Sequence, residues 1–230
     1  MSLLPVTWLD GWPIIGQVLD AGIGAMKWGG DMPFRAEERL AIRRSDDFDE
    51  DRLAPQWQWN HQPRTDFFSL SERRGWLRLK AFRPLEEDEL MKAGNTLTQR
   101  TFRQAENEVT IRIDISCMED GQRAGLCHFS GQHSAIGVAM ENGEHRLEYR
   151  KNGKVRQGPA VRVKYLWLRS EWGLDGLSRY SYSLDGDRFR PFGEPYQMVW
   201  GNYKGDRVGI YCFNDRAEAG CVDVDYFHYR

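Results

Sequence analysis

The stretch Val109-Thr-Ile-Arg-Ile-Asp-Ile115 alternates apolar and polar side chains without interruption. Successive side chains of a β-strand point to opposite faces of a sheet. The aliphatic side chains therefore share one face, and Thr110, Arg112 and Asp114 share the other. This pattern predicts a β-strand with one apolar and one polar face.

Turn residues separate further runs of this kind on both sides of the stretch. Asn142-Gly143, Asn152-Gly153 and Asp185-Gly186 lie between such runs, and these dipeptides favour two-residue hairpins. About a dozen short strands with almost no helix predict an all-β fold, an antiparallel sandwich of two sheets over residues 45–230. The other expected strands cover residues 68–72, 76–80, 135–140, 146–150, 161–168, 179–184, 208–213 and 222–229.

The N-terminal part of the chain differs from the rest in its composition and in its pattern of apolar residues. Residues 1–34 are rich in Gly, Pro and Trp without a helical or strand period, which predicts an irregular arm. We expect this arm to be poorly protected, or to pack on the sandwich or on a second copy of the chain. Residues 35–44 are charged and predict a short helix or a linker. The large aromatic residues of the arm are Trp8, Trp12, Trp28 and Phe34.

Charge and hydropathy argue against two classes of partner. The 230 residues carry 32 Lys+Arg and 34 Asp+Glu, a net charge of −2, whereas nucleic-acid-binding domains usually carry a clustered basic excess. No apolar run approaches the ~18 residues of a membrane-spanning helix. The N-terminal sequence lacks the basic region and long apolar stretch of a secretory signal. We therefore expect a cytoplasmic protein that binds neither nucleic acid nor membrane.

The 4 cysteines do not form a disulfide scaffold in a chain of this length. Cys117 with Cys127, and Cys212 with Cys221, are spaced to face each other across hairpins. A directly opposed cross-strand disulfide is strained, so we expect reduced, partly buried thiols. No Cys-x-x-Cys or Cys/His cluster indicates zinc.

A motif near the start of the expected sandwich is specific enough to indicate a family. Asp46-Asp47-Phe48, followed by Gln56-Trp57-Gln58-Trp59-Asn60-His61-Gln62-Pro63, resembles the start of the C-terminal β-sandwich of glycoside hydrolase family 43 β-xylosidases and α-L-arabinofuranosidases. Residues 5–13 resemble the last stretch of that family's five-bladed catalytic propeller. The resemblance continues through residues 75–79, 95–101, 120–126, 182–189 and 224–229.

The resemblance implies a concanavalin A-like jelly-roll sandwich at residues 45–230, with residues 1–44 as the end of the propeller and a linker. It implies an accessory domain that docks on the catalytic propeller of the same parent protein and helps to close the pocket for xylo-oligosaccharides or arabinosides. The family's catalytic carboxylates belong to the propeller, so we expect a glycosidase parent but no hydrolysis by this chain alone. The alternative is an independent carbohydrate-binding module for plant cell-wall polysaccharide.

Four residues of the matching motifs have a functional and a structural interpretation. Trp57 and Trp59 alternate along a strand and share a face. They form a platform for a sugar, a contact with the catalytic domain, or part of the core. We favour the core for one or both of them. His61 is either a locally hydrogen-bonded, solvated residue or part of the domain interface. Arg100 has three interpretations: it donates hydrogen bonds to loop carbonyls as a hub, it pairs with a carboxylate, or it reaches towards the propeller. We favour the hub.

Residues 128–134 fall where the resemblance places a loop that covers the mouth of the active site. Phe129 is the expected aromatic of this loop and His133 its polar neighbour. The alternatives are an ordinary exposed hairpin loop and a core position for Phe129. Neither His128 nor His133 has the carboxylate or cysteine companions of a zinc site.

No cofactor is required by this interpretation, and calcium is the one candidate ion. Asp46 at the first strand and Asp225 at the last offer the hard oxygen ligands that calcium prefers. In concanavalin-like sandwiches these two ends of the chain often lie side by side. Solvated surface carboxylates are the favoured alternative.

Overall fold

The computed structural model describes residues 4–20, 23–25, 29–30, 42–87, 89–199 and 205–230. The chain divides into two units, Met1–Ile42 and Arg43–Arg230. Among the described residues, no helix has the length and apolar character needed to cross a membrane.

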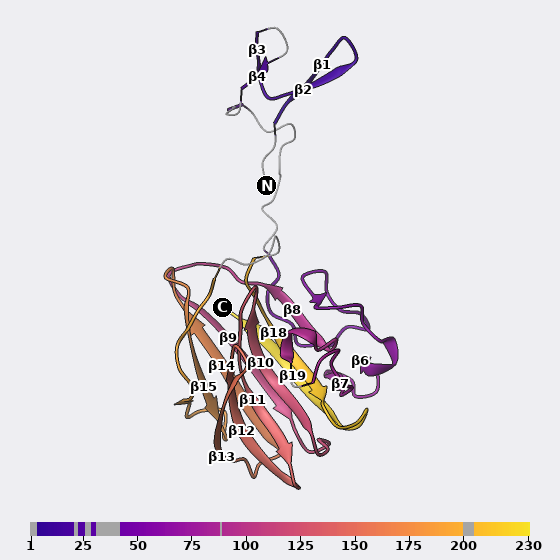
Figure 1. Cartoon of the computed structure of the whole chain (residues 1–230), viewed down its shortest axis with the longest axis vertical. Helices are drawn as coiled ribbons and strands as arrows, with labels where there is room; N and C mark the ends of the chain where they lie inside the picture. Colours follow the sequence, from indigo (N-terminus) through magenta and orange to yellow (C-terminus); the bar gives the residue numbers. More distant parts are fainter. Residues whose placement is uncertain (1–3, 21–22, 26–28, 31–41, 88, 200–204) are drawn as a thin grey trace. The chain divides into compact units, whose positions relative to one another are not determined.

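The larger unit consists of two antiparallel sheets packed face to face (Figure 1). The seven-stranded sheet has the order β13-β12-β11-β10-β18-β8-β5, and the eight-stranded sheet has the order β16-β15-β14-β9-β19-β7-β6, with β17 paired to β15. The first sheet contains β5 (Gln58–Trp59), β8 (Thr96–Arg100), β10 (Gln122–Phe129), β11 (His133–Glu141), β12 (Glu144–Lys151), β13 (Lys154–Ala160) and β18 (Arg207–Asn214). The second contains β6 (Phe68–Ser69), β7 (Leu77–Lys80), β9 (Asn107–Asp114), β14 (Tyr165–Trp172), β15 (Leu177–Ser183), β16 (Arg190–Pro191), β17 (Tyr196–Gln197) and β19 (Cys221–Tyr229). Short 3₁₀ turns lie at η1 (Thr65–Phe67) and η2 (Leu90–Lys92).

β9 shows why the two sheets pack together. Val109, Ile111 and Ile113, which share the apolar face, are fully buried. Leu168 of β14 and Phe227 of β19 lie directly opposite Ile111 on the two neighbouring strands. Full burial of one such side chain stabilises a fold by about 1.5–3 kcal/mol. The alternating stretch therefore forms part of the core between the sheets, and the predicted all-β sandwich is confirmed.

Two of the predicted hairpin turns adopt the expected backbone geometry. Asn142 and Gly143 both have positive φ, as do Asn152 and Gly153. Positive φ at both central residues is the type I′ geometry, which matches the twist of the flanking strands. At the third turn the Asp185 carboxylate accepts hydrogen bonds from the amide N–H groups of Asp187 and Arg188. These hydrogen bonds lower the pKa of Asp185 to about 2.

The N-terminal unit contains two short antiparallel hairpins rather than the irregular arm that we expected. β1 (Val6–Leu9) pairs with β2 (Trp12–Ile15), and β3 (Val18–Asp20) pairs with β4 (Ile23–Gly24). The first hairpin forms because Asp10 and Gly11 both adopt positive φ in the two-residue turn. Trp28, Phe34 and most of the expected linker lie outside the described residues.

All 4 cysteines are free thiols. Cys127 and Cys212 are fully buried. Cys221 donates its amide N–H to the carbonyl of the exposed Cys117 (2.9 Å), rather than to a residue of the expected hairpin partner. Burial raises the pKa of Cys221 to about 12, with a smaller effect from the neighbouring Cys117. A protonated thiol is the weaker nucleophile, so Cys221 is expected to be unreactive at neutral pH.

Candidate functional site

One end of the seven-stranded sheet brings three of the predicted residues into a single row. Arg100 of β8 lies opposite Arg207 of β18, Arg207 lies opposite Phe129 of β10, and Phe129 lies opposite His133 of β11. Directly opposed residues in antiparallel strands project from the same face. The row lies on the face turned away from the other sheet, because the next residue along β18, Val208, belongs to the core between the sheets. We call Arg100, Arg207, Phe129 and His133 the outer row.

Phe129 is buried within the outer row, which contradicts a loop over residues 128–134 and agrees with a core position for its ring. Its neighbours belong to β10 and β11, so only residues 130–132 form the turn. The Phe129 side chain is 8% exposed. Its ring belongs to a second, smaller core on the outer face, under the segment that carries η2. That second core consists of Leu90, Ala93, Cys127, Phe129, Ala135, Tyr211 and Phe213.

Asn60 and His61 hold the η2 segment over the second core. Asn60 Nδ2 donates to the Met91 carbonyl (2.8 Å), and His61 Nε2 lies 3.1 Å from the same oxygen. The His61 side chain is otherwise exposed. The structure thus places His61 in a local hydrogen bond, which was one of its two interpretations.

His133 lies at the other end of the outer row beside a shallow surface pocket. Its amide N–H donates to Asn152 Oδ1 (2.9 Å), and its Nδ1 lies 3.9 Å from Glu89 Oε1. The pocket has Lys92 and Gln132 among its other lining residues. Burial lowers the pKa of His133, and the Glu89 carboxylate opposes this shift.

The lowered pKa of His133 makes the stability of the fold depend on pH. As the pH falls through about 6.5, the unfolded chain takes up a proton at this histidine that the folded chain resists. The stabilisation from neutral His133 is therefore fully present at pH values above the pKa of this histidine in the unfolded chain. At lower pH it is lost by at most about 1.4 kcal/mol per pH unit. We expect His133→Gln to reduce the loss of unfolding free energy between about pH 7.5 and 5.5, measured by urea unfolding. An unchanged loss in the variant would contradict this.

The two tryptophans of the family motif lie in or against the core between the sheets. Trp57 stacks on Phe48 and meets Phe227 edge to face, with ring centroids 5.9 and 5.0 Å away. Its Nε1 donates to Asp46 Oδ2 (2.7 Å). Trp59 is half-buried against Phe68, with ring centroids 4.8 Å apart. The favoured core interpretation therefore describes Trp57, and Trp59 packs at its edge.

The surroundings of Asp46 and Asp225 do not fit calcium. Asp46 accepts from the indole of Trp57 and from the Phe48 amide N–H (3.0 Å), while Asp225 accepts from Arg112 Nη1 (2.8 Å). These N–H donors occupy both oxygens of Asp46 and Oδ2 of Asp225, where a cation would bind. In the part of the chain that the structure describes, no group of three His, Cys, Asp or Glu residues is placed to hold a metal.

His128 lies between the sheets in a buried polar chain. Its Nε2 lies 2.9 Å from Ser170 Oγ, and its Nδ1 lies 3.3 Å from Asp206 Oδ1. This order of Asp, His and Ser is that of a catalytic triad. Both His128 and Ser170 are 0% exposed, so no substrate reaches the serine. The chain of hydrogen bonds is therefore a structural element of the core.

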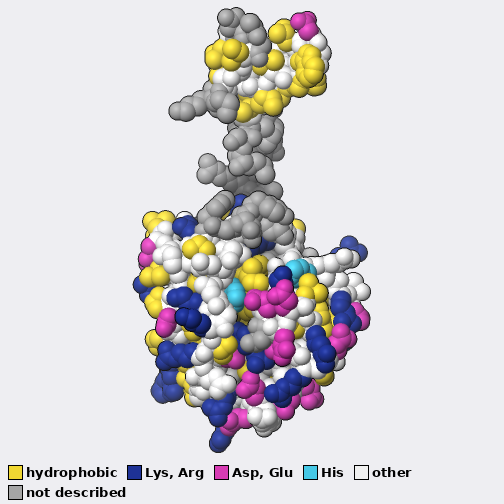
Figure 2. Space-filling view, in the orientation of Figure 1, with side chains coloured by type: hydrophobic (Ala, Val, Ile, Leu, Met, Phe, Trp, Pro, Cys, Tyr) yellow, Lys and Arg dark blue, Asp and Glu magenta, His cyan; other side chains and the backbone are white. Residues whose placement is uncertain are grey.

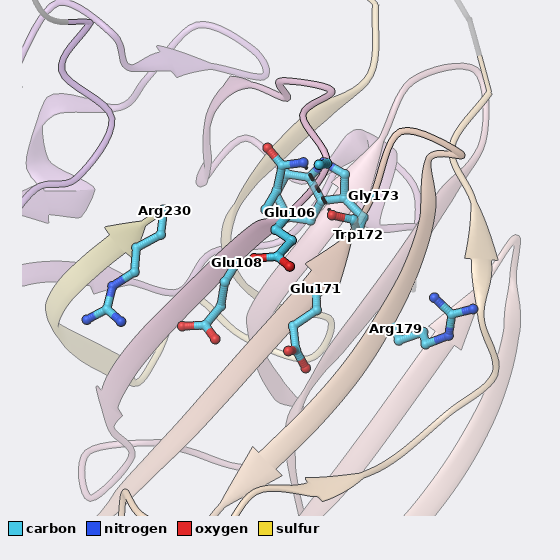
Figure 3. Close-up of a pocket in the computed structure, with 9 residues that line it drawn as sticks. Glu106, Glu108, Glu171, Trp172, Gly173, Arg179 and Arg230 are labelled. Carbon is cyan, nitrogen blue, oxygen red and sulfur yellow. Dashed lines mark hydrogen bonds between the residues drawn. The ribbon is translucent and has the colours of Figure 1, made fainter.

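A polar groove on the eight-stranded sheet has an open, acidic centre. Glu108 of β9 and Glu171 of β14 lie directly opposite each other and join Glu106 in a groove of about 730 Å³. Figure 3 shows the three glutamates between Arg230 on one side and Arg179 on the other. The aromatic residue that lines the groove, Trp172, is itself buried. The groove therefore offers carboxylates but no ring face on which a sugar could stack.

Comparison with known families shows which family the sandwich belongs to. Residues 45–230 match the family described as the β-xylosidase C-terminal concanavalin A-like domain. The chain belongs to this family. The predicted concanavalin A-like sandwich and the resemblance to family 43 are therefore confirmed.

Relatives of this β-xylosidase C-terminal domain are longer proteins. A β-xylosidase of Formosa agariphila is 36% identical over 99% of this chain and 42% of its own length. A putative β-xylosidase of Xylanibacter ruminicola is 29% identical over 91% of this chain and 38% of its own. Among solved structures, a bifunctional GH43-CE protein of Bacteroides eggerthii is 28% identical, with a TM-score of 0.76 over 100% of this chain and 30% of its own. The chain thus spans well under half the length of these relatives.

Sequence reasoning about this family member missed several residues of the site. Arg207 was not singled out, although it is the direct neighbour of Arg100. Glu89, Ser170 and Asp206 were also missed. No local motif marks these four, because each meets its partner only through the register of strands or segments far apart in sequence. The predicted hub role of Arg100 is not seen, since Arg100 makes no hydrogen bond with any residue that the structure describes.

Proposed function

We propose that this chain is the accessory C-terminal domain of a family 43-like glycosidase, and that it docks on the catalytic propeller of the same protein. There it helps to close the pocket for xylo-oligosaccharides or arabinosides. The observation that supports this is the family match over residues 45–230 together with a 36% identical β-xylosidase of which the chain covers only 42%. The chemistry is proposed to lie in the remaining part, and the sandwich to act through shape and position.

The N-terminal unit carries apolar surface that a partner would cover. Trp8 is 69% exposed and Trp12 75% exposed, and Ile15 and Leu19 are also exposed. Figure 2 shows hydrophobic side chains over much of the described surface of this unit. Contiguous exposed apolar patches of this kind usually mark an interaction site. We propose that these hairpins complete the propeller, whose other strands would cover them.

The alternative, an independent carbohydrate-binding module, would require aromatic ring faces free to stack on sugars. The outer face of the eight-stranded sheet does carry half-exposed aromatic residues, including Trp76 and Tyr165. However, the guanidinium group of Arg73 lies 3.7 Å from the ring centroid of Trp76, and that of Arg112 lies 4.2 Å from that of Tyr165. Cation–π contacts already occupy these faces, so the accessory role is better supported.

Protection of the N-terminal hairpins tests the proposal that they complete the propeller. In this chain alone, we expect fast amide hydrogen exchange in β1 and β2, because few buried contacts hold them. In the longer protein that includes the catalytic part, the same amides should exchange at least about tenfold more slowly, since burial raises the free energy of local opening. Deuterium uptake of residues 6–15, measured by mass spectrometry on both proteins, gives the comparison. Equal uptake would contradict completion of the propeller by these hairpins, and tight binding of this chain to xylan would then favour the module.

A further inference from the structure

The outer row contains two arginines that face each other without a carboxylate. Arg100 and Arg207 are directly opposed on β8 and β18, so their side chains leave the same face of the sheet. No ion pair joins either guanidinium group to Asp or Glu among the residues that the structure describes. By contrast, the partly buried Arg73 and Arg78 each bind Asp223.

Burial makes this arrangement costly for the isolated chain. Of the two, only Arg207 is buried (9% exposed), whereas Arg100 is exposed. The Arg207 guanidinium group donates to the neutral side chain of Gln58. Burial lowers the pKa of Arg207, and the neighbouring charge of Arg100 lowers it further. A buried cation beside a like charge is destabilising unless an anion neutralises it. The surface is therefore incomplete as it stands.

The chemistry of the pair defines the missing group. Each guanidinium group is a planar fork of N–H donors, which matches the two oxygens of a carboxylate better than a point charge does. Asp206 lies beside the pair in sequence, but its carboxylate turns inward to His128 and its side chain is 6% exposed. It therefore does not supply the anion.

The position of the pair indicates where the carboxylate comes from. Gln99, next to Arg100, donates its side-chain N–H to the carbonyl of Arg44 (2.8 Å), so the pair lies at the end of the sandwich where the chain enters it. A domain that precedes residue 44 in sequence would approach this end first. We propose that Arg100 and Arg207 together bind the carboxylate of an Asp or Glu side chain of the catalytic domain of the same protein. This inference rests on the proposed function and names the contact through which docking occurs.

The inference predicts that Arg100→Gln acts with opposite sign in two contexts. In this chain alone, the substitution removes a like-charge contact, so the Tm should rise by about 1–3 °C. In the longer protein it removes half of the carboxylate site, so the Tm of the docked form should fall, and the fall should shrink in about 0.5 M sodium chloride. Arg100→Lys should leave the Tm of this chain unchanged, because lysine keeps the charge. In the longer protein it should cause part of the fall in Tm, because lysine lacks the planar donors. Arg190→Gln, an exposed arginine on the edge strand β16, is the matched control and should change neither protein.

Three outcomes would overturn the inference. A fall in Tm of equal size in both proteins would show that Arg100 is structural. No effect in the longer protein would refute the carboxylate contact, and protection of β1 and β2 there would leave the accessory role in place. Unprotected hairpins would contradict the proposal that they complete the propeller, on which this inference also rests. The last outcome concerns added ligands. In that outcome glucuronate, but not acetate, would raise the Tm of this chain, and Arg100→Gln would abolish the rise. If the substitution also left the Tm of the longer protein unchanged, the pair would bind a free acidic sugar instead.

Discussion

Phe129→Ala is expected to lower the free energy of unfolding of this chain by about 3–5 kcal/mol. The Phe129 ring is buried in the second core beneath the η2 segment, in the cluster that also holds Leu90 and Tyr211. Truncation removes the ring and leaves a cavity, because the Asn60 and His61 contacts to the Met91 carbonyl keep the η2 segment in place. Urea unfolding followed by circular dichroism measures the effect.

The matched control for this prediction is Phe189→Ala. Phe189 is half-buried, and the guanidinium group of Arg169 lies 3.6 Å from its ring centroid, a contact worth about 0.5–1 kcal/mol. A Phe129→Ala chain with the stability of the wild type would contradict burial in the second core. If that variant also slowed xyloside hydrolysis in the longer protein, Phe129 would instead contact substrate or the catalytic domain.

Trp57→Ala should cost a similar amount, about 3–5 kcal/mol of unfolding free energy. Trp57 fills the space between Phe48 and Phe227 and donates to the buried Asp46 carboxylate. Trp57→Phe keeps most of the ring but removes the donor, and an unsatisfied buried acceptor costs about 1–3 kcal/mol. The difference between the two variants therefore separates packing from hydrogen bonding.

Trp59→Phe is the matched control for the Trp57 variants. The indole N–H of Trp59 has no hydrogen-bond partner among the described residues, and the ring of Trp59 is half-buried against Phe68. We expect a change below about 1 kcal/mol. Chemical unfolding followed by far-ultraviolet circular dichroism is suitable, because it does not depend on the tryptophans that are replaced. Equal losses for Trp57→Phe and Trp59→Phe would refute the role assigned to the Asp46 contact.

Much of the fold could be predicted because its signals are local. The strict alternation of residues 109–115 determines which face of β9 is buried, and the Asn-Gly turns at 142 and 152 determine two hairpins. The N-terminal hairpins were missed although Asp10-Gly11 is the same kind of turn signal. The composition of the arm, rich in Gly, Pro and Trp, outweighed that one dipeptide. Its strands also bury little, so they lack the alternation that marks a core strand.

The site was harder to predict because it depends on register between distant strands. Arg100, Phe129 and His133 were each identified from motifs, but their alignment in one row follows from the pairing of β8, β18, β10 and β11. The burial of Phe129 could not be foreseen, since the η2 segment that covers it lies about 40 residues earlier and pairs with no strand. Arg207 was missed for the same reason.

The most direct test of the central claim is the hydrolysis of nitrophenyl β-xyloside and nitrophenyl arabinofuranoside by this chain and by the longer protein. If the chain is an accessory domain whose catalytic carboxylates lie elsewhere, it releases nitrophenol no faster than buffer, whereas the longer protein hydrolyses one of the substrates. Turnover by the purified 230-residue chain, retained after removal of any contaminating glycosidase, would contradict the account.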